Sequence, residues 1–374
     1  MYVYSLSLMF RMWNLPHYRN KDFQTDLLKN LRNVAIPGTG IPLSWFCIHK
    51  SLVVVFLWVI YPLLSFLSAL LHAYPFKAIS LSHAFSTQLL CPEDWFSLWQ
   101  LNCRIASFHA LLTHSSSYQI ENKWEFLQQG AQLHPPVSVS PFNTQDSAIV
   151  VKDRNEEGGM GIYMFGNAVH GGQWIIQPKL ENSREIAKFL PDPAPLSTFR
   201  VMTMSKVFCA GKQATADSIV CLSATFRAGL KNASTDHKSV LFPFNLSTGE
   251  FELGTSNAHW YKLGLSGIQD LFGGRAKLVS ERNLTHHPDS QVKVAGERLD
   301  MDLVKLIKDA SMDAHLRLAP DVFIIGWDVA LTDKGCFLLE ANLSCNFFRA
   351  DFNRDLYFES IHALFQKLET YSQP

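Results

Sequence analysis

The stretch that decides the fold is VFIIGWDVALTDKGCFLLEANLSCN, residues 322–346. It contains two short runs of alternating apolar residues joined by a sequence typical of a tight turn, and this pattern predicts a β-hairpin. We expect a three-residue loop at positions 333–335, with Gly335 in the left-handed conformation that closes a type I turn plus bulge. In that register Asp328 lies directly opposite Glu340.

Three oxygen-bearing side chains of this hairpin, Asp328, Glu340 and Asn342, should share one face, because directly opposed residues and their second neighbours point the same way. Two opposed carboxylates repel each other, so a hard cation between them would make the arrangement tolerable. Oxygen-only ligands suit Mg²⁺ or Mn²⁺, with nucleotide phosphates completing the coordination shell. The alternative is a salt-bridged hairpin in which Asn342 has no special role.

The composition argues against several other kinds of site. The chain has 374 residues, enough for two or three domains with a sizeable core. Its formal net charge is zero, so no basic surface for nucleic acid is expected. The seven cysteines are scattered, odd in number and without a CxxC pair. This indicates reduced, mostly buried thiols rather than a disulfide framework or a zinc site.

The N-terminal part contains a predicted membrane segment. Residues 51–76 contain no Asp, Glu, Lys or Arg, and about 20 apolar helical residues span a bilayer core. Pro62 lies within the segment and makes a kinked span or a re-entrant hairpin possible. A buried core helix is the alternative. The lead, residues 1–50, has no signal-peptide cleavage pattern, and its basic residues either rest on an anionic membrane surface or belong to an unstructured terminus.

Residues 78–145 should form a helical linker between the membrane segment and the rest of the chain. One helix is expected from Pro92 to about Leu112, because proline and acidic residues favour a first turn and apolar residues follow at helical intervals. A second, shorter helix is expected from Asn122 to about Gly130. Lys123, in its first turn, is a candidate phosphate ligand, and a solvated surface lysine is the alternative.

The following segment has the pattern of a flap and a hinge. A buried strand at 148–152 ends in Lys152, a glycine-containing loop follows, and a second strand is expected at 162–165. Backbone N–H groups of such a loop can contact phosphates, although most glycine loops are plain turns. A third strand ends at Gln177 and Pro178, where unpaired backbone groups could contact an adenine edge. A simple strand end is the competing interpretation.

Two further strands are predicted at 197–204 and 219–227. The first contains Arg200 between apolar neighbours, and a guanidinium in such a strand usually faces an anion. We expect residues 242–254 and 263–276 to be loops and short hairpins. His287 lies in a polar turn, where it either contacts a substrate as an acid or base or merely stabilises the turn.

Two helices complete the expected fold. The first is capped by Asp300 or Asp302 and runs to about Leu318. Its predicted apolar stripe consists of Leu303, Leu306, Ile307, Ala310, Ala314 and Leu318. The second is expected over residues 354–371, with Leu356, Ile361, Leu364 and Leu368 buried.

From about Lys123 to Asn346 the chain resembles the ATP-grasp superfamily, and it is most similar to the sugar-transfer-associated ATP-grasp family. The strings that carry the resemblance are IVVKDRNEEGGMGIY, WIIQPKLENS, STFRVMT, HPDS and FIIGWDVALTDKGCFLLEAN. The resemblance implies an α+β fold in which two subdomains with antiparallel sheets clamp the nucleotide, here at 146–374 and preceded by the N-terminal membrane helix. The usual N-terminal α/β domain is shortened, and LSCNFFRADFN lacks the Pro-Gly turn of many relatives.

The same resemblance assigns roles to individual residues. Lys152 and Arg200 would be catalytic and would contact phosphate. The nucleotide-binding set would be Lys123, Lys152, Gly158, Gly159, Gly161, Gln177, Lys179, Leu180 and Arg200. The ligands of Mg²⁺ or Mn²⁺ would be Asp328, Glu340 and Asn342.

The expected activity is that of an ATP-dependent ligase. It would activate a carboxylate as an acyl phosphate with Mg-ATP and transfer the acyl group to an amine or thiol. A phosphotransferase acting on a hydroxyl and a non-catalytic nucleotide-binding membrane protein are the alternatives. The expected partners are a small-molecule carboxylate, its acceptor and a membrane bound through residues 51–76, with no nucleic acid. The catalytic part should lie on an ATP-containing, cytoplasmic side.

Overall fold

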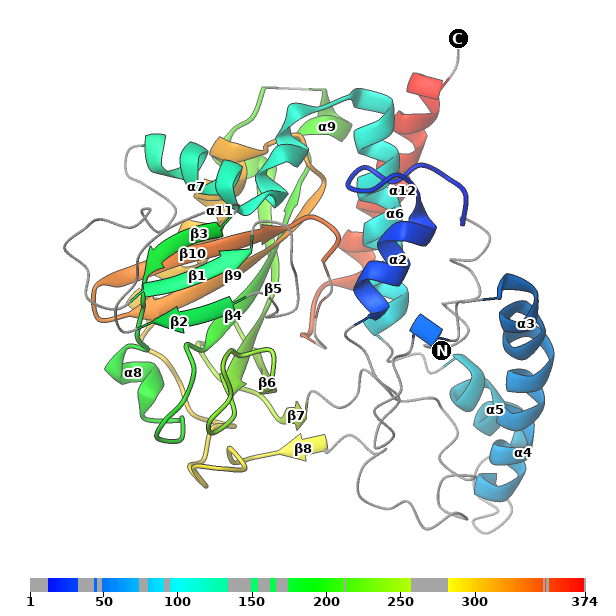
Figure 1. The fold of residues 1–374 in the computed structure, drawn as a ribbon, viewed down its shortest axis with the longest axis horizontal. Coiled ribbons are helices and arrows are strands. Elements are labelled where there is room, and N and C mark those ends of the chain that lie inside the picture. The colour runs from blue at the N-terminus through cyan, green and yellow to red at the C-terminus, as the bar shows by residue number, and fades with distance from the viewer. Residues whose placement is uncertain are drawn as a thin grey trace. The chain divides into compact units, whose positions relative to one another are not determined.

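The computed structural model describes residues 13–32, 44–45, 49–73, 80–90, 95–133, 149–153, 162–165, 174–211, 213–256, 282–345, 347 and 350–372. The chain divides into two compact units (Figure 1). The first consists of Met1–Leu101 with Thr255–Arg282, and the second of Asn102–Gly254 with Asn283–Pro374.

Helices dominate the described part of the first unit. They are α2 (Phe23–Leu31), α3 (Lys50–Val55), a π-helical turn (Phe56–Ile60), α4 (Tyr61–Ala73) and α5 (Leu81–Leu90). Helix α6 (Trp95–Thr113) begins in this unit and continues into the second.

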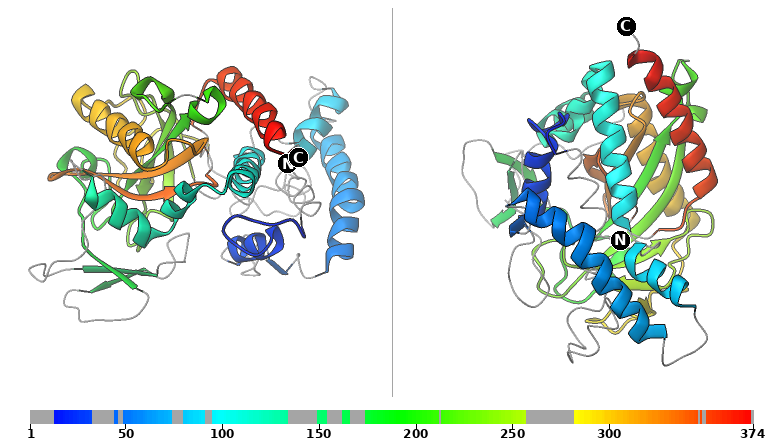
Figure 2. Two further views of the ribbon diagram at one scale, coloured as in Figure 1. Left: turned by 90° about the horizontal axis from the view of Figure 1, so that it is seen from above. Right: turned by 90° about the vertical axis from the view of Figure 1, so that its right-hand side faces the viewer.

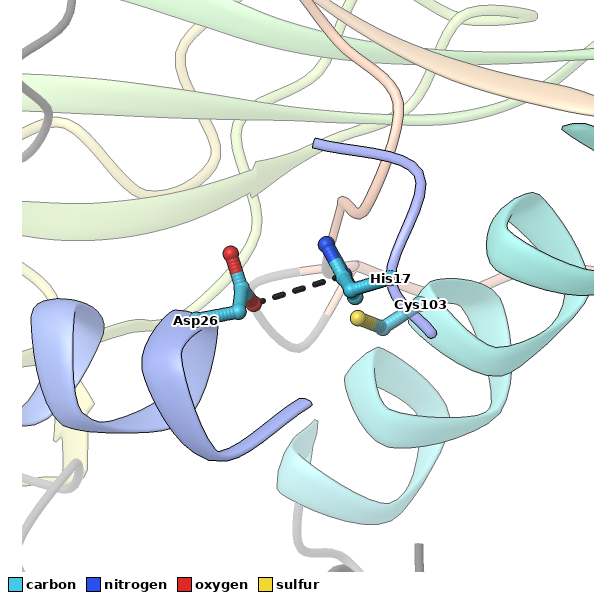
Figure 3. A group of neighbouring side chains, drawn as sticks. All are labelled: His17, Asp26 and Cys103. Atoms are coloured by element: carbon cyan, nitrogen blue, oxygen red, sulfur yellow. Dashed lines mark ion pairs between the residues drawn. The ribbon is translucent and has the colours of Figure 1, made fainter. Parts of the chain in front are cut away.

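A buried ionic network holds the segment that leads into α2. Asp26 accepts hydrogen bonds from Arg19 Nη2 at 2.8 Å and from Asn20 Nδ2 at 2.7 Å. His17 Nε2 lies 3.4 Å from the other carboxylate oxygen of Asp26 (Figure 3). Burial lowers the pKa of His17 to about 4, so its ring is neutral at neutral pH. The network is therefore a local structural anchor built on the arginine–carboxylate pair.

Helix α3, the π turn and α4 form one continuous apolar helix. Its segment Lys50–Leu71 has a mean hydropathy of 2.3, and 29% of its most apolar window is buried in the protein. By length and composition it is the one helix among the described residues that could cross a membrane. Pro62 does not interrupt it, because Tyr61 N–H reaches back to Phe56 O in a wider π turn that relieves the crowding before proline. The described segment is thus a helix and not a re-entrant hairpin.

The second unit combines short and long helices with the β-sheets. Its helices are a 3₁₀ turn (Ser116–Glu121), α7 (Lys123–Gln132), α8 (Arg184–Ala187), α9 (Val207–Ala210), a second 3₁₀ turn (Ala216–Ser218), α11 (Met301–Leu318) and α12 (Arg354–Ser372). Asn122 caps α7 with its side chain and Asp300 caps α11, as the sequence predicts for the latter.

Two sheets give the chain its α+β character. A three-stranded sheet has the order β2-β1-β3 and a seven-stranded sheet the order β10-β9-β4-β5-β6-β7-β8. The small sheet consists of β1 (Ile149–Asp153), β2 (Ile162–Phe165) and β3 (Trp174–Pro178). The large sheet consists of β4 (Thr198–Ser205), β5 (Ile219–Gly229), β6 (Ser239–Phe244), β7 (Gly254–Ser256), β8 (Arg282–Leu284), β9 (Ile324–Thr332) and β10 (Gly335–Asn342). The small sheet and strands β10 to β6 of the large sheet pair antiparallel.

Helix α11 packs across β5, β4, β9 and β10 (Figure 2). Its buried face contains Val304, Ile307, Ser311, Ala314 and His315. The predicted stripe is wrong at Leu306, which is 42% exposed. The buried face is rotated away from the predicted stripe, and it includes His315, whose Nδ1 atom hydrogen-bonds Thr203 Oγ1 of β4 at 2.7 Å. A purely apolar criterion could not detect a buried polar pair of this kind.

The predicted loops and short hairpins at 242–254 begin with the end of β6, and the chain turns back through an antiparallel bridge between Phe244 and Phe251. Every residue of β6 is buried, and the strand pairs with β5. Pro243 lacks an N–H donor, but its carbonyl accepts from Glu252 N at 2.8 Å. The proline therefore remains compatible with a strand at this position. Residues 263–276 lie outside the described residues.

The hairpin that decides the fold has a shorter turn than predicted. Gly335 pairs with Thr332, so the loop has two residues, and Gly335 has a φ of 125°. The predicted pairing of Thr332 with Cys336 is wrong. An irregularity between Leu338 and Glu340 nevertheless shifts the register by one residue. The extra residue thus lies inside β10 and not in the turn.

Candidate functional site

A row of polar residues crosses four neighbouring strands of the large sheet. Arg200 of β4 pairs with Thr225 of β5 on one side and with Asp328 of β9 on the other, and Asp328 pairs with Glu340 of β10. Directly opposed residues share a face. The preceding residue of β9, Trp327, points to the α11 side, where its indole N–H donates to Thr203. The polar row therefore lies on the face opposite α11.

Asp328 is held by two arginines. Arg200 Nε lies 2.5 Å from Asp328 Oδ1, and Arg227 Nη1 lies 3.0 Å from Asp328 Oδ2. The Asp328 side chain is 8% exposed. Burial alone would raise the pKa of this carboxyl, but Arg200 and Arg227 outweigh burial and lower the pKa to about 2. Asp328 is therefore ionised throughout the physiological range.

Asn342 and Gly326 extend the row at the next pleat. Asn342 Nδ2 donates to Gly326 O at 3.3 Å and approaches Glu340 Oε1 at 3.5 Å. A Cβ atom at position 326 would lie 2.7 Å from Cys345 Cβ and 3.2 Å from Arg200 Cδ. A side chain larger than hydrogen therefore does not fit at Gly326. The aliphatic part of Arg200 lies close to the backbone of β9 because of this glycine.

The segment before the small sheet also contributes to the site. Lys123 Nζ, from the first turn of α7, lies 3.7 Å from Glu340 Oε2. Glu121 Oε1 accepts a hydrogen bond from the backbone N–H of Leu343 at 3.2 Å, directly after Asn342. Phe126 of α7 packs near Trp327, with ring centroids 6.2 Å apart. The helix–turn segment thus fixes the end of β10 and brings a lysine to Glu340.

The charges of the site are balanced. Lys123, Arg200 and Arg227 face the carboxylates of Asp236, Asp328 and Glu340. Despite burial, which disfavours its charge, Asp236 and Asp328 raise the pKa of Arg227. The positive side chains of the protein therefore relieve the repulsion between Asp328 and Glu340. A metal ion is not needed for this purpose, contrary to the expectation from the sequence.

The donor atoms nevertheless fit a divalent cation. The side chain of Glu340 is 32% exposed, and Lys123 Nζ approaches it only at 3.7 Å. The amide nitrogen of Asn342 points to Gly326 O, which leaves the amide oxygen as the atom for a cation. Each oxygen of Asp328 retains a second lone pair beside its arginine. Glu340 and Asn342 are thus the better-suited ligands, and Asp328 lies directly behind them.

The remaining predicted residues are distributed differently. Lys152 lies in β1 opposite Ile162 and Ile175, and its side chain lies outside the described part of the structure. Gly158, Gly159 and Gly161 lie outside the described residues.

In the predicted hinge, Gln177 is 4% exposed, and its Nε2 atom has no hydrogen-bond partner among the described residues. Lys179 is exposed and Leu180 half-buried. The described residues show no contact that brings Gln177, Lys179 or Leu180 to the row of Arg200, Asp328 and Glu340.

His287 is a structural residue of its turn. Its Nε2 lies 3.2 Å from Gly229 O, and its Nδ1 accepts from the backbone N–H groups of Asp289 and Ser290 at 3.2 and 3.4 Å. The ring is fully buried. Burial lowers its pKa, so it is neutral and donates through Nε2. This geometry supports the turn-stabilising interpretation.

Glu121, Arg227 and Asp236 of the site were missed from the sequence. Arg227 ends the predicted strand 219–227, and Ser223, Thr225 and Arg227 alternate with apolar residues. That alternation could have assigned a polar face to this strand. Asp236 follows in a turn and carries no sequence signal of its own.

No protein-family model matches the chain, and no curated protein matches it. Among solved structures, a crystal structure from Archaeoglobus fulgidus, described as a candidate member of the ATP-grasp superfamily, is similar to 61% of this chain. The identity is 11% and the TM-score 0.30, and the match spans 46% of that protein, less than half its length. A likeness of this size establishes neither fold nor family. The proposals below therefore rest on the residues of the site.

Proposed function

We propose that the second unit is an ATP-dependent ligase of the ATP-grasp type, which activates a carboxylate with Mg-ATP and transfers it to an amine or thiol. The observation that supports this most directly is the row Arg200–Asp328–Glu340 with Asn342 beside it. It combines two oxygen ligands suited to Mg²⁺ with cations suited to phosphate, on one face of a rigid sheet.

In this proposal each side chain binds or orients a charged group. Glu340 and Asn342, with a lone pair of Asp328, would hold Mg²⁺, which would supply positive charge to neutralise the phosphates of ATP. Lys123 and Arg200 would compensate charge on the phosphates and on the acyl phosphate. Lys152 and the loop with Gly158, Gly159 and Gly161 would cover the triphosphate, and Gln177, Lys179 and Leu180 would line the base.

The proposed reaction proceeds in two balanced steps. A substrate carboxylate oxygen attacks the γ-phosphorus of ATP, the bond from that phosphorus to the β–γ bridging oxygen breaks, and ADP leaves. The amine or thiol then attacks the acyl carbon, the bond from that carbon to the phosphate oxygen breaks, and the acceptor's proton passes to the departing phosphate. A carboxylate needs no proton removed before it attacks, whereas a hydroxyl does. Asp236, Asp328 and Glu340 each lie beside an arginine or a lysine, which makes these three carboxylates poor general bases and supports a ligase over a phosphotransferase.

We further propose that the helix Lys50–Leu71 anchors the protein in a membrane, with the second unit on the cytoplasmic, ATP-containing side. The support is the exposed apolar surface of this helix, which includes Leu52, Val59, Leu63 and Leu67 at 50–67% exposure. The proposed partners are a small-molecule carboxylate, its amine or thiol acceptor and the lipid bilayer.

The test of the proposed reaction is a screen with the full chain in detergent micelles. ADP release from Mg-ATP is measured against pools of carboxylates, each with and without a pool of amines and thiols. The proposal predicts ADP release that requires a carboxylate and Mg²⁺. ADP release with hydroxyl compounds alone would indicate the phosphotransferase, and ATP binding without ADP release in any pool would indicate a non-catalytic nucleotide-binding protein.

A further inference from the structure

Arg227 lies behind Asp328 and contacts two carboxylates at once. Its Nη1 atom lies 3.0 Å from Asp328 Oδ2, and its Nη2 atom lies 3.1 Å from Asp236 Oδ1. The side chain is 11% exposed. A guanidinium is planar and rigid, so the two contacts together fix both its position and its plane.

The second carboxylate is itself fixed. Thr198 Oγ1 donates to Asp236 Oδ2, and Thr198 pairs directly with Arg227 across β4 and β5. Asp236 is 9% exposed. The anchor of Arg227 is therefore tied to the same two strands that carry Arg200 and Thr225, and it cannot move independently of the sheet.

The contacts form a chain of alternating charges. Asp236, Arg227, Asp328 and Arg200 follow one another, and each is hydrogen-bonded or ion-paired to the next. Arg227 and Arg200 take different oxygens of Asp328, so the carboxylate cannot rotate without losing one of them. The plane of Asp328 in turn determines where its free lone pairs point in relation to Glu340.

We propose that Arg227 is a positioning residue of the nucleotide site, which acts through Asp328 to fix the carboxylate plane and the guanidinium of Arg200. This inference rests on the proposed function. Arg227 need not touch the nucleotide: its hydrogen bond to Asp328 orients this carboxylate, and its charge also acts on Glu340.

Two substitutions separate this role from a merely structural one. Arg227→Gln and Asp236→Asn both break the same Arg227–Asp236 ion pair, but only the first removes the contact with Asp328. Calorimetry of the full chain in micelles measures affinity for a non-hydrolysable ATP analogue with Mg²⁺, and thermal unfolding is followed in parallel. We expect Arg227→Gln to lose about tenfold or more in affinity. Asp236→Asn should change it by less than about threefold, because the amide oxygen of asparagine can still accept a hydrogen bond from Arg227 and hold its position.

If the single variant Arg227→Gln does not fold, the double variant Arg227→Gln/Asp236→Asn replaces it in the comparison. It removes one positive and one negative charge together. It should bind the analogue about tenfold more weakly than Asp236→Asn alone. Arg227→Lys, which keeps the charge, should recover part of the affinity. Equal losses in Asp236→Asn and Arg227→Gln, or wild-type affinity in the folded double variant, would overturn the positioning role while the proposed function stands. A wild-type chain that does not bind the analogue would overturn both.

Discussion

Asp328 and Glu340 lie directly opposite each other in the β9–β10 hairpin, although the turn between their strands has two residues rather than three. The register shift between Leu338 and Glu340 supplies the missing residue. A single residue of slip would have turned Glu340 away from Asp328. The irregularity in β10 is thus what keeps the carboxylates of the two strands on one face.

The first prediction concerns Glu340. Glu340→Gln removes one charge but keeps the shape of the side chain, so the fold should persist. Because Glu340 is the most exposed carboxylate of the site and faces Asn342, its loss should weaken Mg²⁺-dependent nucleotide binding by roughly a hundredfold. Calorimetry with the ATP analogue measures this. Glu359→Gln on the exposed side of α12 is the matched control and should leave binding unchanged.

The second prediction concerns Gly326. In Gly326→Ala the new methyl group would overlap Cys345 Cβ and crowd Arg200 Cδ. We expect a loss of about 1–3 kcal/mol in the free energy of unfolding together with weaker nucleotide binding, because Arg200 must move. Gly249→Ala, which meets the Leu299 carbonyl at 2.7 Å in a turn with a φ of 71°, is the control. It should lose stability without losing affinity, and equal affinity losses in both variants would refute the link to Arg200.

The third prediction concerns the pH dependence of stability. Burial lowers the pKa of His315 from 6.5 to about 4. Between these values the unfolded chain binds a proton that the folded chain does not, so stability is complete above pH 6.5 and falls as the pH drops towards 4. At pH 5 this residue alone should cost about 2 kcal/mol.

Urea unfolding at pH 7 and pH 5 measures this cost. His315→Gln is expected to be less stable at pH 7, because the hydrogen bonds to Thr203 and Val322 are altered. Its loss on going to pH 5 should be smaller than that of the wild type by about 2 kcal/mol. His362→Gln, on the exposed side of α12, should keep the wild-type pH dependence. If His315→Gln lost as much stability between pH 7 and pH 5 as the wild type, groups other than His315 would cause the pH dependence.

The fourth prediction concerns the apolar helix. Leu63 and Leu67 are 60% and 50% exposed. Replacing both with Asp should release the protein from membranes, because an acidic residue at the centre of a span costs about 2.5–3.5 kcal/mol. Sedimentation of cell membranes measures the distribution. Leu306→Asp on α11, also an exposed leucine, is the control and should remain membrane-bound. Retention of the double variant in the membrane fraction would contradict the proposed anchor.

The hairpin shows what could be predicted from the sequence. The opposition of Asp328 and Glu340 was predicted from a three-residue turn, and it is observed although the turn has two residues, because the register shift in β10 has the same effect. The position of the extra residue did not follow, because a turn and an internal bulge change the register by the same amount. The pairing of Asp328 with Arg200 and Arg227 joins strands far apart in the sequence, and no local pattern specifies it.

Local signals also failed where buried polar groups decide the packing. His315 and Ser311 face the sheet from α11, although the predicted apolar stripe of this helix does not include them. Strand β6 was also not identified from the sequence as a strand of the large sheet; its pairing with β5, which joins residues that no local pattern links, determines its conformation. By contrast, β2 begins and ends where the sequence predicts, because its short apolar run is bounded by turn residues.

The central claim is that Glu340 and Asn342, with Asp328 behind them, hold a divalent ion that carries a nucleotide triphosphate. Calorimetric titration of the full chain in micelles with ATP, with Mg²⁺ and with EDTA, tests it most directly. The account predicts a saturable heat of binding with Mg²⁺ that is lost in EDTA and in Glu340→Gln. An absence of heat in the folded wild-type chain with Mg²⁺, or binding that Glu340→Gln leaves unchanged, would contradict it.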